Sequence, residues 1–104
     1  MTTQYQAFMI PDNVRALVEA ERLNQVILWG SGSDNPDPIW MSILAEEMGE
    51  TAKEVQNIFF SEYDPDYAAQ KALQTELAQV AAVAITWLER LTNGSRGSVQ
   101  SGAD

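Results

Sequence analysis

Residues 38–59 read PIWMSILAEEMGETAKEVQNIF, and the prediction of the fold begins with this stretch. Apolar residues recur along it every three or four positions, which is the spacing of an amphipathic α-helix. Pro38 suits the first turn of a helix, because the amide hydrogen that proline lacks has no partner there. We therefore expect a helix over residues 38–59. Its predicted apolar arc consists of Trp40, Met41, Leu44, Met48, Ala52, Val55, Ile58 and Phe59.

Two further helices are expected on either side of this stretch. The first covers residues 12–29, where an apolar repeat follows turn-forming residues and stops at Gly30. The other covers residues 66–91, which contain no glycine or proline, and Gly94 follows as a candidate left-handed C-cap. No segment alternates like a strand. The sequence therefore predicts an all-α fold, a small bundle of three main helices.

The chain is short enough to form one domain. We expect a helical domain over residues 1–92, with loops at residues 31–38 and 61–66 where turn-forming residues gather. Residues 93–104 are rich in serine and glycine, so we expect a disordered C-terminal tail. Three helices with wide apolar faces bury little surface alone, which favours completion of the bundle as a homodimer or homotetramer.

Composition excludes several classes of function. The 104 residues carry a formal net charge of -9 and include no cysteine or histidine. A zinc site of thiolates or imidazoles is therefore excluded, and a nucleic-acid partner is not expected, because phosphate backbones bind to basic surfaces. The longest apolar stretch, residues 80–88, is far shorter than the ~20 residues that span a membrane. Since the first eight residues do not resemble a signal peptide, we expect a cytoplasmic protein without a membrane partner.

Acidic residues border the apolar arc of the helix at residues 38–59. At about 100° per residue, Glu47, Glu50 and Glu54 lie together on one flank of that arc. In the helix at residues 66–91, Glu76 lies inside the apolar margin. Like charges beside apolar surface repel one another and lose water, and a cation bound by oxygen ligands would remove that cost.

An antiparallel pairing of these two helices would bring Glu76 near Glu47 and Glu50. Carboxylates that face one another across a bundle commonly hold metal ions, and oxygen ligands favour Mg²⁺, with Mn²⁺ as a substitute. Glu54 is a candidate further ligand on the same strip. The alternative is an acidic helix surface that is simply solvated, because Glu-rich helices are common and short motifs match by chance.

The acidic residues also form a motif. Glu46-Glu47-Met48-Gly49-Glu50, followed 26 residues later by Glu76-Leu77-Ala78-Gln79, resembles the E-E-x-x-E … E-x-x-D signature of the MazG-like all-α nucleoside triphosphate pyrophosphohydrolases. The positions of Trp29-Gly30 and Trp40 are similar to those in small stand-alone members from phages and bacteria. The resemblance covers about residues 14–91.

The resemblance implies an activity and roles for these residues. Such enzymes hydrolyse an NTP or dNTP to the monophosphate and pyrophosphate with Mg²⁺. Glu47, Glu50 and Glu76 match metal ligands. Glu46 matches the first acid of the motif, which could be a ligand, a group that orients a ligand, or a base that orients water; Glu46 and Glu47 are the candidate catalytic residues. Gln79 stands where the family has Asp, so it would offer a neutral carbonyl oxygen as a weaker ligand. The number of bound ions stays open.

Recognition of a base would need an aromatic or amide lining. Trp29 and Trp40 are predicted substrate-binding residues, because they flank the loop at residues 30–38 and this loop could close a pocket. The alternative is that both tryptophans are core or interface anchors. Gln25 could contact a base edge, although an exposed position is the simpler interpretation.

Binding of the phosphates would need basic residues. Lys53 and Lys71 are the predicted substrate-binding lysines, with Arg22 and Arg90 as further candidates. Each could equally be a solvated surface residue, since lysine and arginine are mostly exposed in proteins.

Two other functions fit the same residues. A degenerate member of the family could bind metal or nucleotide without turnover, as a sensor or an assembly protein, and Gln79 motivates this hypothesis. A dimeric helical scaffold without a small-molecule site is the simplest alternative.

Overall fold

The structure is a computed structural model, and it describes residues 6–32, 34–60 and 67–94. Its elements are a short 3-10 helix η1 (Gln6–Phe8) and the helices α1 (Asp12–Trp29), α2 (Asp37–Phe59) and α3 (Tyr67–Asn93). These ranges contain no strand. The all-α prediction is confirmed, and the three predicted helices begin and end within two residues of their observed positions.

Glycine ends two of the helices as predicted. Gly30 has a φ of 76° and donates its amide hydrogen to the Val26 carbonyl at 2.8 Å, which ends α1. Gly94 has a φ of 80° and donates to the Arg90 carbonyl at 2.8 Å after α3. Glycine is favoured at both positions, because a side chain makes a positive φ costly. The loop predicted at residues 61–66 and most of the predicted tail, residues 95–104, lie outside the described residues.

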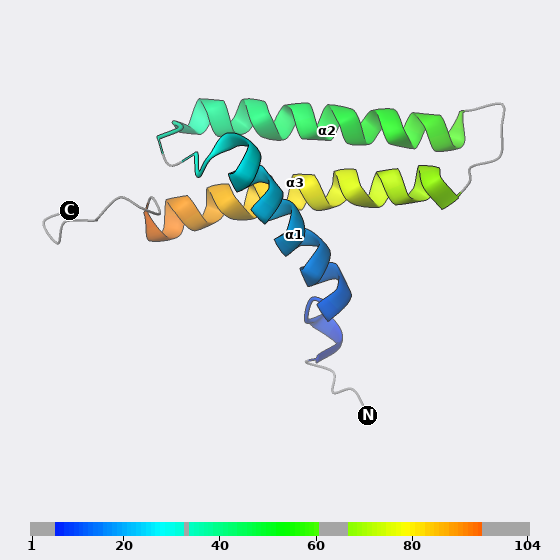
Figure 1. Cartoon of the computed structure of the whole chain (residues 1–104), viewed down its shortest axis with the longest axis horizontal. Helices are drawn as coiled ribbons and strands as arrows, with labels where there is room; N and C mark the ends of the chain where they lie inside the picture. The colour runs from blue at the N-terminus through cyan, green and yellow to red at the C-terminus, as the bar shows by residue number, and fades with distance from the viewer. Residues whose placement is uncertain (1–5, 33, 61–66, 95–104) are drawn as a thin grey trace, which may run out of the picture.

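The α2 and α3 helices run antiparallel, side by side, and α1 crosses over α3 at a steep angle (Figure 1). Within the described residues α1 packs on α3, and its N-terminal half extends beyond the α2–α3 pair. None of these helices is long and apolar enough to cross a membrane.

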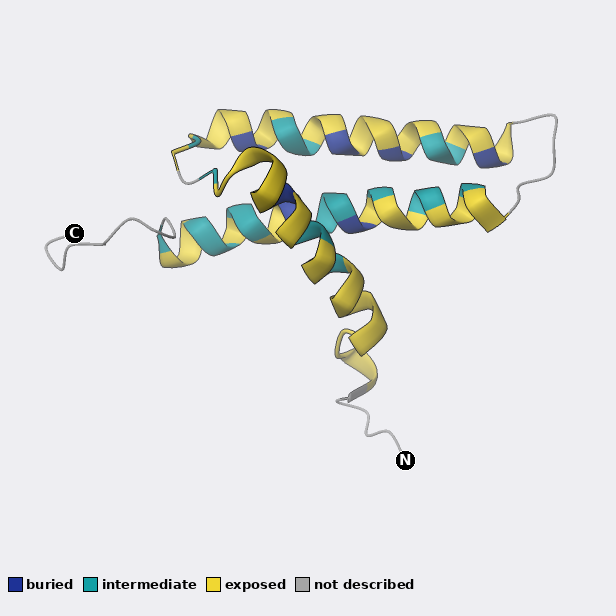
Figure 2. Ribbon diagram, viewed as in Figure 1, coloured by how far each residue is buried: buried dark blue, intermediate teal, exposed yellow. Residues whose placement is uncertain are grey.

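The core is thin and is formed by buried residues of both α2 and α3, with one buried residue on α1 (Figure 2). Ala82 is fully buried and Val83 is 1% exposed, with Ala78 buried one turn earlier. Trp40 and Ile58 are the buried hydrophobic residues of α2. Small side chains on α3 allow the other helices to approach closely, so packing here depends on close contact of the backbones more than on large apolar residues.

Much of the predicted apolar arc of α2 is not buried in this single chain. Trp40 and Ile58 are buried, whereas Met41, Met48 and Phe59 each remain more than half exposed. An apolar stripe wider than the contact with one neighbouring helix leaves a second, uncovered face.

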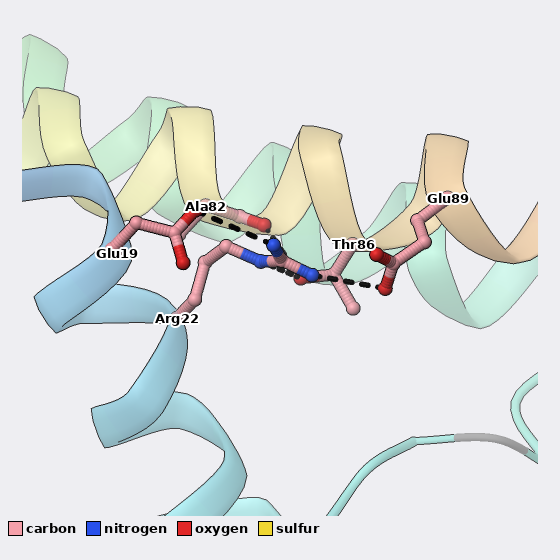
Figure 3. A network of polar contacts seen from close by, with 5 residues as sticks. All are labelled: Glu19, Arg22, Ala82, Thr86 and Glu89. Atoms are coloured by element: carbon pink, nitrogen blue, oxygen red, sulfur yellow. Dashed lines mark hydrogen bonds and ion pairs between the residues drawn. The ribbon is translucent and has the colours of Figure 1, made fainter. Parts of the chain in front are cut away.

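A polar network holds α1 on α3 (Figure 3). Arg22 of α1 donates from Nε to Thr86 Oγ1 at 3.3 Å and from Nη2 to Glu89 Oε1 at 2.9 Å. Its Nη1 also pairs with Glu19 Oε1 at 3.5 Å, and Thr86 donates to the Ala82 carbonyl at 2.8 Å. The hydrogen bonds to charged groups fix the crossing of α1, and with it the position of the next turn of that helix.

We expect Ala82→Leu to lower the free energy of unfolding by about 1–3 kcal/mol, because the fully buried site has no room for three more carbon atoms. Chemical denaturation measures the change. Ala68→Leu, an exposed position of α3, is the matched control and should change the free energy by less than about 0.5 kcal/mol. Equal effects of the two substitutions would contradict tight packing at Ala82.

Candidate metal centre

Three carboxylates meet between α2 and α3. Glu47 and Glu50 come from α2 and Glu76 comes from α3, and one oxygen of each lies within 4.8 Å of the others. Glu47 is buried, Glu76 is half-buried and Glu50 is exposed. Glu47 and Glu50 reach the same point because residues three apart lie on neighbouring turns of one helix face. The antiparallel pairing thus brings Glu76 to the acidic flank of α2, as the helical periodicity predicted.

Glu76 is the carboxyl most affected by this crowding. Burial raises its pKa first, followed by the charge of Glu50 and a hydrogen bond with Glu50, and then by the charges of Glu47 and Glu54, which together bring the pKa to about 7. A raised pKa means that the ionised form lacks compensating positive charge. Near neutral pH Glu76 therefore retains a proton for part of the time.

Glu47 shows the same effect at the buried end of the cluster. Its pKa is raised mainly by loss of water on burial, and further by the charges of Glu50, Glu46 and Glu21. Glu46, Glu47 and Glu50 belong to α2 and Glu21 belongs to α1, so negative charge lies around Glu47 on two helices. A cation bound here would reverse the direction of both shifts.

Gln79 lies between two of the carboxylates. With its amide oriented so that both ends find suitable partners, the nitrogen donates to Glu47 Oε2 at 3.0 Å and to Glu76 Oε2 at 2.9 Å. Its backbone carbonyl accepts a hydrogen bond from Gln25 Nε2 at 3.2 Å. In this orientation the side-chain amide of Gln79 holds the carboxylates together by donating to both. Its side-chain oxygen would reach a metal only after the amide group rotates by half a turn.

The chemistry of the donor set fits a hard divalent cation. All the donors are carboxylate oxygens, which Mg²⁺ and Mn²⁺ prefer. A Mg²⁺ ion about 2.1 Å from each oxygen needs them no more than about 4.2 Å apart, so the cluster would contract slightly on binding. Glutamate side chains allow such a movement. Glu54, a half-buried residue on the same flank, acts on Glu76 through its charge but does not belong to the group of three.

A cavity of about 300 Å³ opens beside the carboxylates. Three predicted substrate-binding residues, Gln25, Trp29 and Trp40, line it together with Glu46 and Glu47. Trp29 is 57% exposed at the mouth, whereas Trp40 is buried. The other lining residues are Arg22, Val26, Gly30, Ser31, Gly32, Asn35, Ile43, Val83 and Thr86.

The loop after α1 closes one side of this cavity. Gly32 has a φ of 66°, and a Cβ there would lie 3.1 Å from the Trp40 ring, so the loop depends on glycine to pass over the tryptophan. The backbone N–H of Asn35 donates to the Gly32 carbonyl at 3.0 Å, and the guanidinium of Arg90 in α3 donates to the same oxygen. Trp40 Nε1 has no hydrogen-bond partner within the described residues, which leaves a buried donor next to the cavity.

The remaining predicted site residues lie elsewhere or in unexpected surroundings. Lys53 and Lys71 are exposed and do not line the cavity, and Lys71 Nζ lies 5.9 Å from the centre of the Tyr67 ring. The simpler interpretation of Gln25 as exposed is wrong, because it is buried against α3 by its hydrogen bond to the backbone. Arg22 lines the cavity, but Glu89 and Thr86 occupy its guanidinium.

Sequence reasoning missed Asn35 and Ile43 as cavity residues. The signal for Asn35 was its place among turn formers, but nothing in the loop sequence shows that the chain folds back over Trp40. Nothing matches this chain in comparisons with family models, curated proteins or solved structures.

We expect the metal-free protein to lose stability as pH rises. Glu76 titrates near 4.5 when unfolded and at about 7 when folded, so the folded chain binds more protons between these values. The stabilisation is complete below about pH 4.5 and is lost as pH rises through about 7. Melting in chelator across this range measures it. Glu76→Gln should flatten the pH dependence, and Asp34→Asn, at an exposed loop position, should leave it unchanged; the same fall in both variants would contradict the assignment to Glu76.

Proposed function

We propose that this protein is a Mg²⁺-dependent nucleotide pyrophosphohydrolase, which converts an NTP or dNTP and water to the monophosphate and pyrophosphate. One observation carries the proposal: Glu47 belongs both to the three-carboxylate cluster and to the wall of the aromatic-lined cavity. A ligand in that cavity would have its polar end next to the carboxylates. The resemblance of the acidic motifs to those of MazG-like enzymes supports the same activity.

The cavity suits the nucleoside part of such a substrate. Its volume of about 300 Å³ lies at the lower end of the range for small-molecule pockets. Trp29 offers an exposed aromatic surface for stacking, and Asn35 offers a polar side chain for a base edge. The buried Nε1 of Trp40 would gain a partner if a small shift of the loop admitted a carbonyl oxygen.

The carboxylates suit the phosphate end. Bound Mg²⁺ would supply positive charge to the phosphate oxygens and lower the pKa of water. Glu47, Glu50 and Glu76 would hold the ion, with Gln79 and Glu54 as further ligands. Glu46 lines the cavity and reaches solvent, so we assign it to orient the attacking water and accept its proton. The water oxygen bonds to the α-phosphorus as the bond to pyrophosphate breaks.

The proposal extends to assembly and location. We propose a homodimer or homotetramer, because much apolar surface remains exposed in the single chain. A cytoplasmic location is part of the same proposal, since nucleoside triphosphates are substrates of that compartment. Mn²⁺ would replace Mg²⁺ at the same oxygen ligands.

One observation favours the alternative of a binding protein without turnover. Gln79 already bridges Glu47 and Glu76 by two hydrogen bonds, so the cluster holds together without an ion. A neutral amide also contributes less to metal affinity than the aspartate at that position of the motif. Such a protein would bind metal or nucleotide and act as a sensor or an assembly module.

Pyrophosphate release from a panel of NTPs and dNTPs with Mg²⁺ tests the activity. We expect turnover of at least one substrate, and a loss of about 100-fold or more in Glu47→Gln and in Glu50→Gln, because each removes a negative charge that would hold Mg²⁺ next to the reacting phosphate. Asp34→Asn is the charge-matched control. If the folded protein releases no pyrophosphate but Mg²⁺ raises its melting temperature, the alternative holds. If Mg²⁺ changes nothing, the scaffold interpretation holds.

The substitution Gln79→Asp tests whether Gln79 is a functioning metal ligand or a replacement that has weakened the metal site. The substitution removes two hydrogen bonds to carboxylates and adds a fourth charge, so we expect the metal-free protein to melt at a lower temperature. Degeneracy predicts a gain of about 10-fold to 100-fold in Mg²⁺ affinity, measured by calorimetry, together with a faster rate. Little change in affinity or rate would mean that Gln79 already serves the site.

A further inference from the structure

The connection between α1 and α2 is held by α3 at two points. Arg90 of α3 donates from Nη1 to the Gly32 carbonyl, and Trp87 donates from Nε1 to Asp37 Oδ1 at 2.9 Å. Asp37 is the first residue of α2, so the two bonds lie near the beginning and at the end of the connection. Because residues three apart lie on neighbouring turns of one helix face, a single face of α3 fixes both points.

The Gly32 carbonyl accepts two hydrogen bonds, which is the full capacity of its oxygen. The bond from the backbone N–H of Asn35 is local and closes the turn on itself. The bond from Arg90 comes from a charged donor on another helix, and such bonds are stronger than those between neutral groups. Arg90 is therefore the polar contact that ties this turn to α3.

Arg90 forms no ion pair with a carboxylate of the described residues, although the chain has a net charge of -9. Arg15 and Arg22, the other arginines in that part of the chain, both form such pairs. The half-buried guanidinium of Arg90 is instead bonded to a backbone oxygen. This arrangement indicates that Arg90 fixes the backbone and does not serve to balance charge.

A second cavity of about 300 Å³ lies against the one beside the carboxylates, and the two share a wall. Arg90 lines only the second cavity, whereas Gly32 lines only the first. Arg90 therefore reaches the first cavity from behind its wall, where it would not touch a molecule bound inside. The residues that line both cavities are Arg22, Val26, Ser31, Trp40 and Thr86.

Gly32 in turn lies directly on the ring of Trp40. A Cβ at Gly32 would lie 3.1 Å from Cζ2 and 3.2 Å from Cη2 of that ring, so the backbone of the turn and the indole are in close contact. Trp40 is buried and forms part of the cavity wall. If Gly32 moved away, the ring would gain space to move, and the shape that the cavity offers to a base would change.

We propose that Arg90 is a positioning residue that sets the nucleoside selectivity of the first cavity by holding Gly32 against Trp40. This inference rests on the proposed function, in which that cavity takes the nucleoside part of the substrate. The role differs from phosphate binding, because the guanidinium lies behind the cavity wall. Loss of the bond would loosen the wall that fits the base and would leave the carboxylate cluster in place.

Steady-state kinetics of Arg90→Met with several nucleotides and Mg²⁺ tests the proposal, because methionine keeps an apolar stem and removes the donors. We expect KM to rise about 10-fold for the preferred nucleotide and less for the others, with kcat within about twofold of wild type. Arg90→Lys keeps a charged donor and should restore most of the change. If nucleotides bind without turnover, their dissociation constants replace KM.

Arg15→Met is the matched control. Arg15 also donates to a backbone carbonyl, that of Ile10 at 3.3 Å, but it lies in the N-terminal half of α1 and lines neither cavity. It should leave KM and selectivity unchanged. An equal rise in KM for every nucleotide in Arg90→Met would indicate a phosphate contact and would overturn the proposal, as would a fall in kcat with KM unchanged.

Gly32→Ala perturbs the same contact from the other side, because its Cβ would push against the Trp40 ring. We expect it to raise KM for the preferred nucleotide as Arg90→Met does. The double variant should then lose less than the sum of the two single variants, since both changes act through one turn. Fully additive losses would contradict a shared path through Gly32.

Amide hydrogen exchange followed by NMR tests the bond without substrate or metal. In Arg90→Met we expect the Asn35 amide to exchange about 10-fold faster or more, whereas the amide of Val83 in the core keeps its rate and shows that the fold is intact. The two possible failures are distinguishable. A wild-type chain that neither binds nor hydrolyses a nucleotide overturns the proposed function, whereas unchanged exchange at Asn35 overturns the role of Arg90 alone.

Discussion

Repulsion among three carboxylates opposes the pairing of α2 and α3. Glu47, Glu50 and Glu76 lie in the contact between two helices, and the pKa of Glu76 is raised to about 7 there. A helix pair that only needed stability would turn these side chains outward. Gln79 offsets part of the cost with two hydrogen bonds, and the proposed cation would offset the remainder.

The sequence predicted the features that depend on local chemistry. Helix ends at Gly30 and Gly94 follow from the conformational freedom of glycine, and the approach of Glu76 to Glu47 follows from helical periodicity plus antiparallel pairing. The acidic residues of the cluster could also be identified from the sequence, because helical periodicity shows which side chains share one side of a helix.

The sequence could not show which face of each helix packs against a neighbouring helix. Each of α2 and α3 has an apolar arc wider than one contact, and periodicity alone does not tell which part faces the neighbour. Burial of Gln25 needs a backbone carbonyl on another helix, and the fold of the loop over Trp40 needs Gly32 with positive φ. Both arise from contacts between residues far apart in the chain, which no local pattern encodes.

The carboxylate cluster and much of the cavity wall come from different helices, so they can change separately during evolution. The carboxylates belong to α2 and α3, whereas Gln25, Trp29 and the loop after them belong to α1 and its continuation. Polar links such as that of Arg22 join the two parts. Under the proposed function, replacements in α1 would alter which molecules enter the cavity while the acidic cluster stays intact. Selectivity and reactivity would then diverge separately.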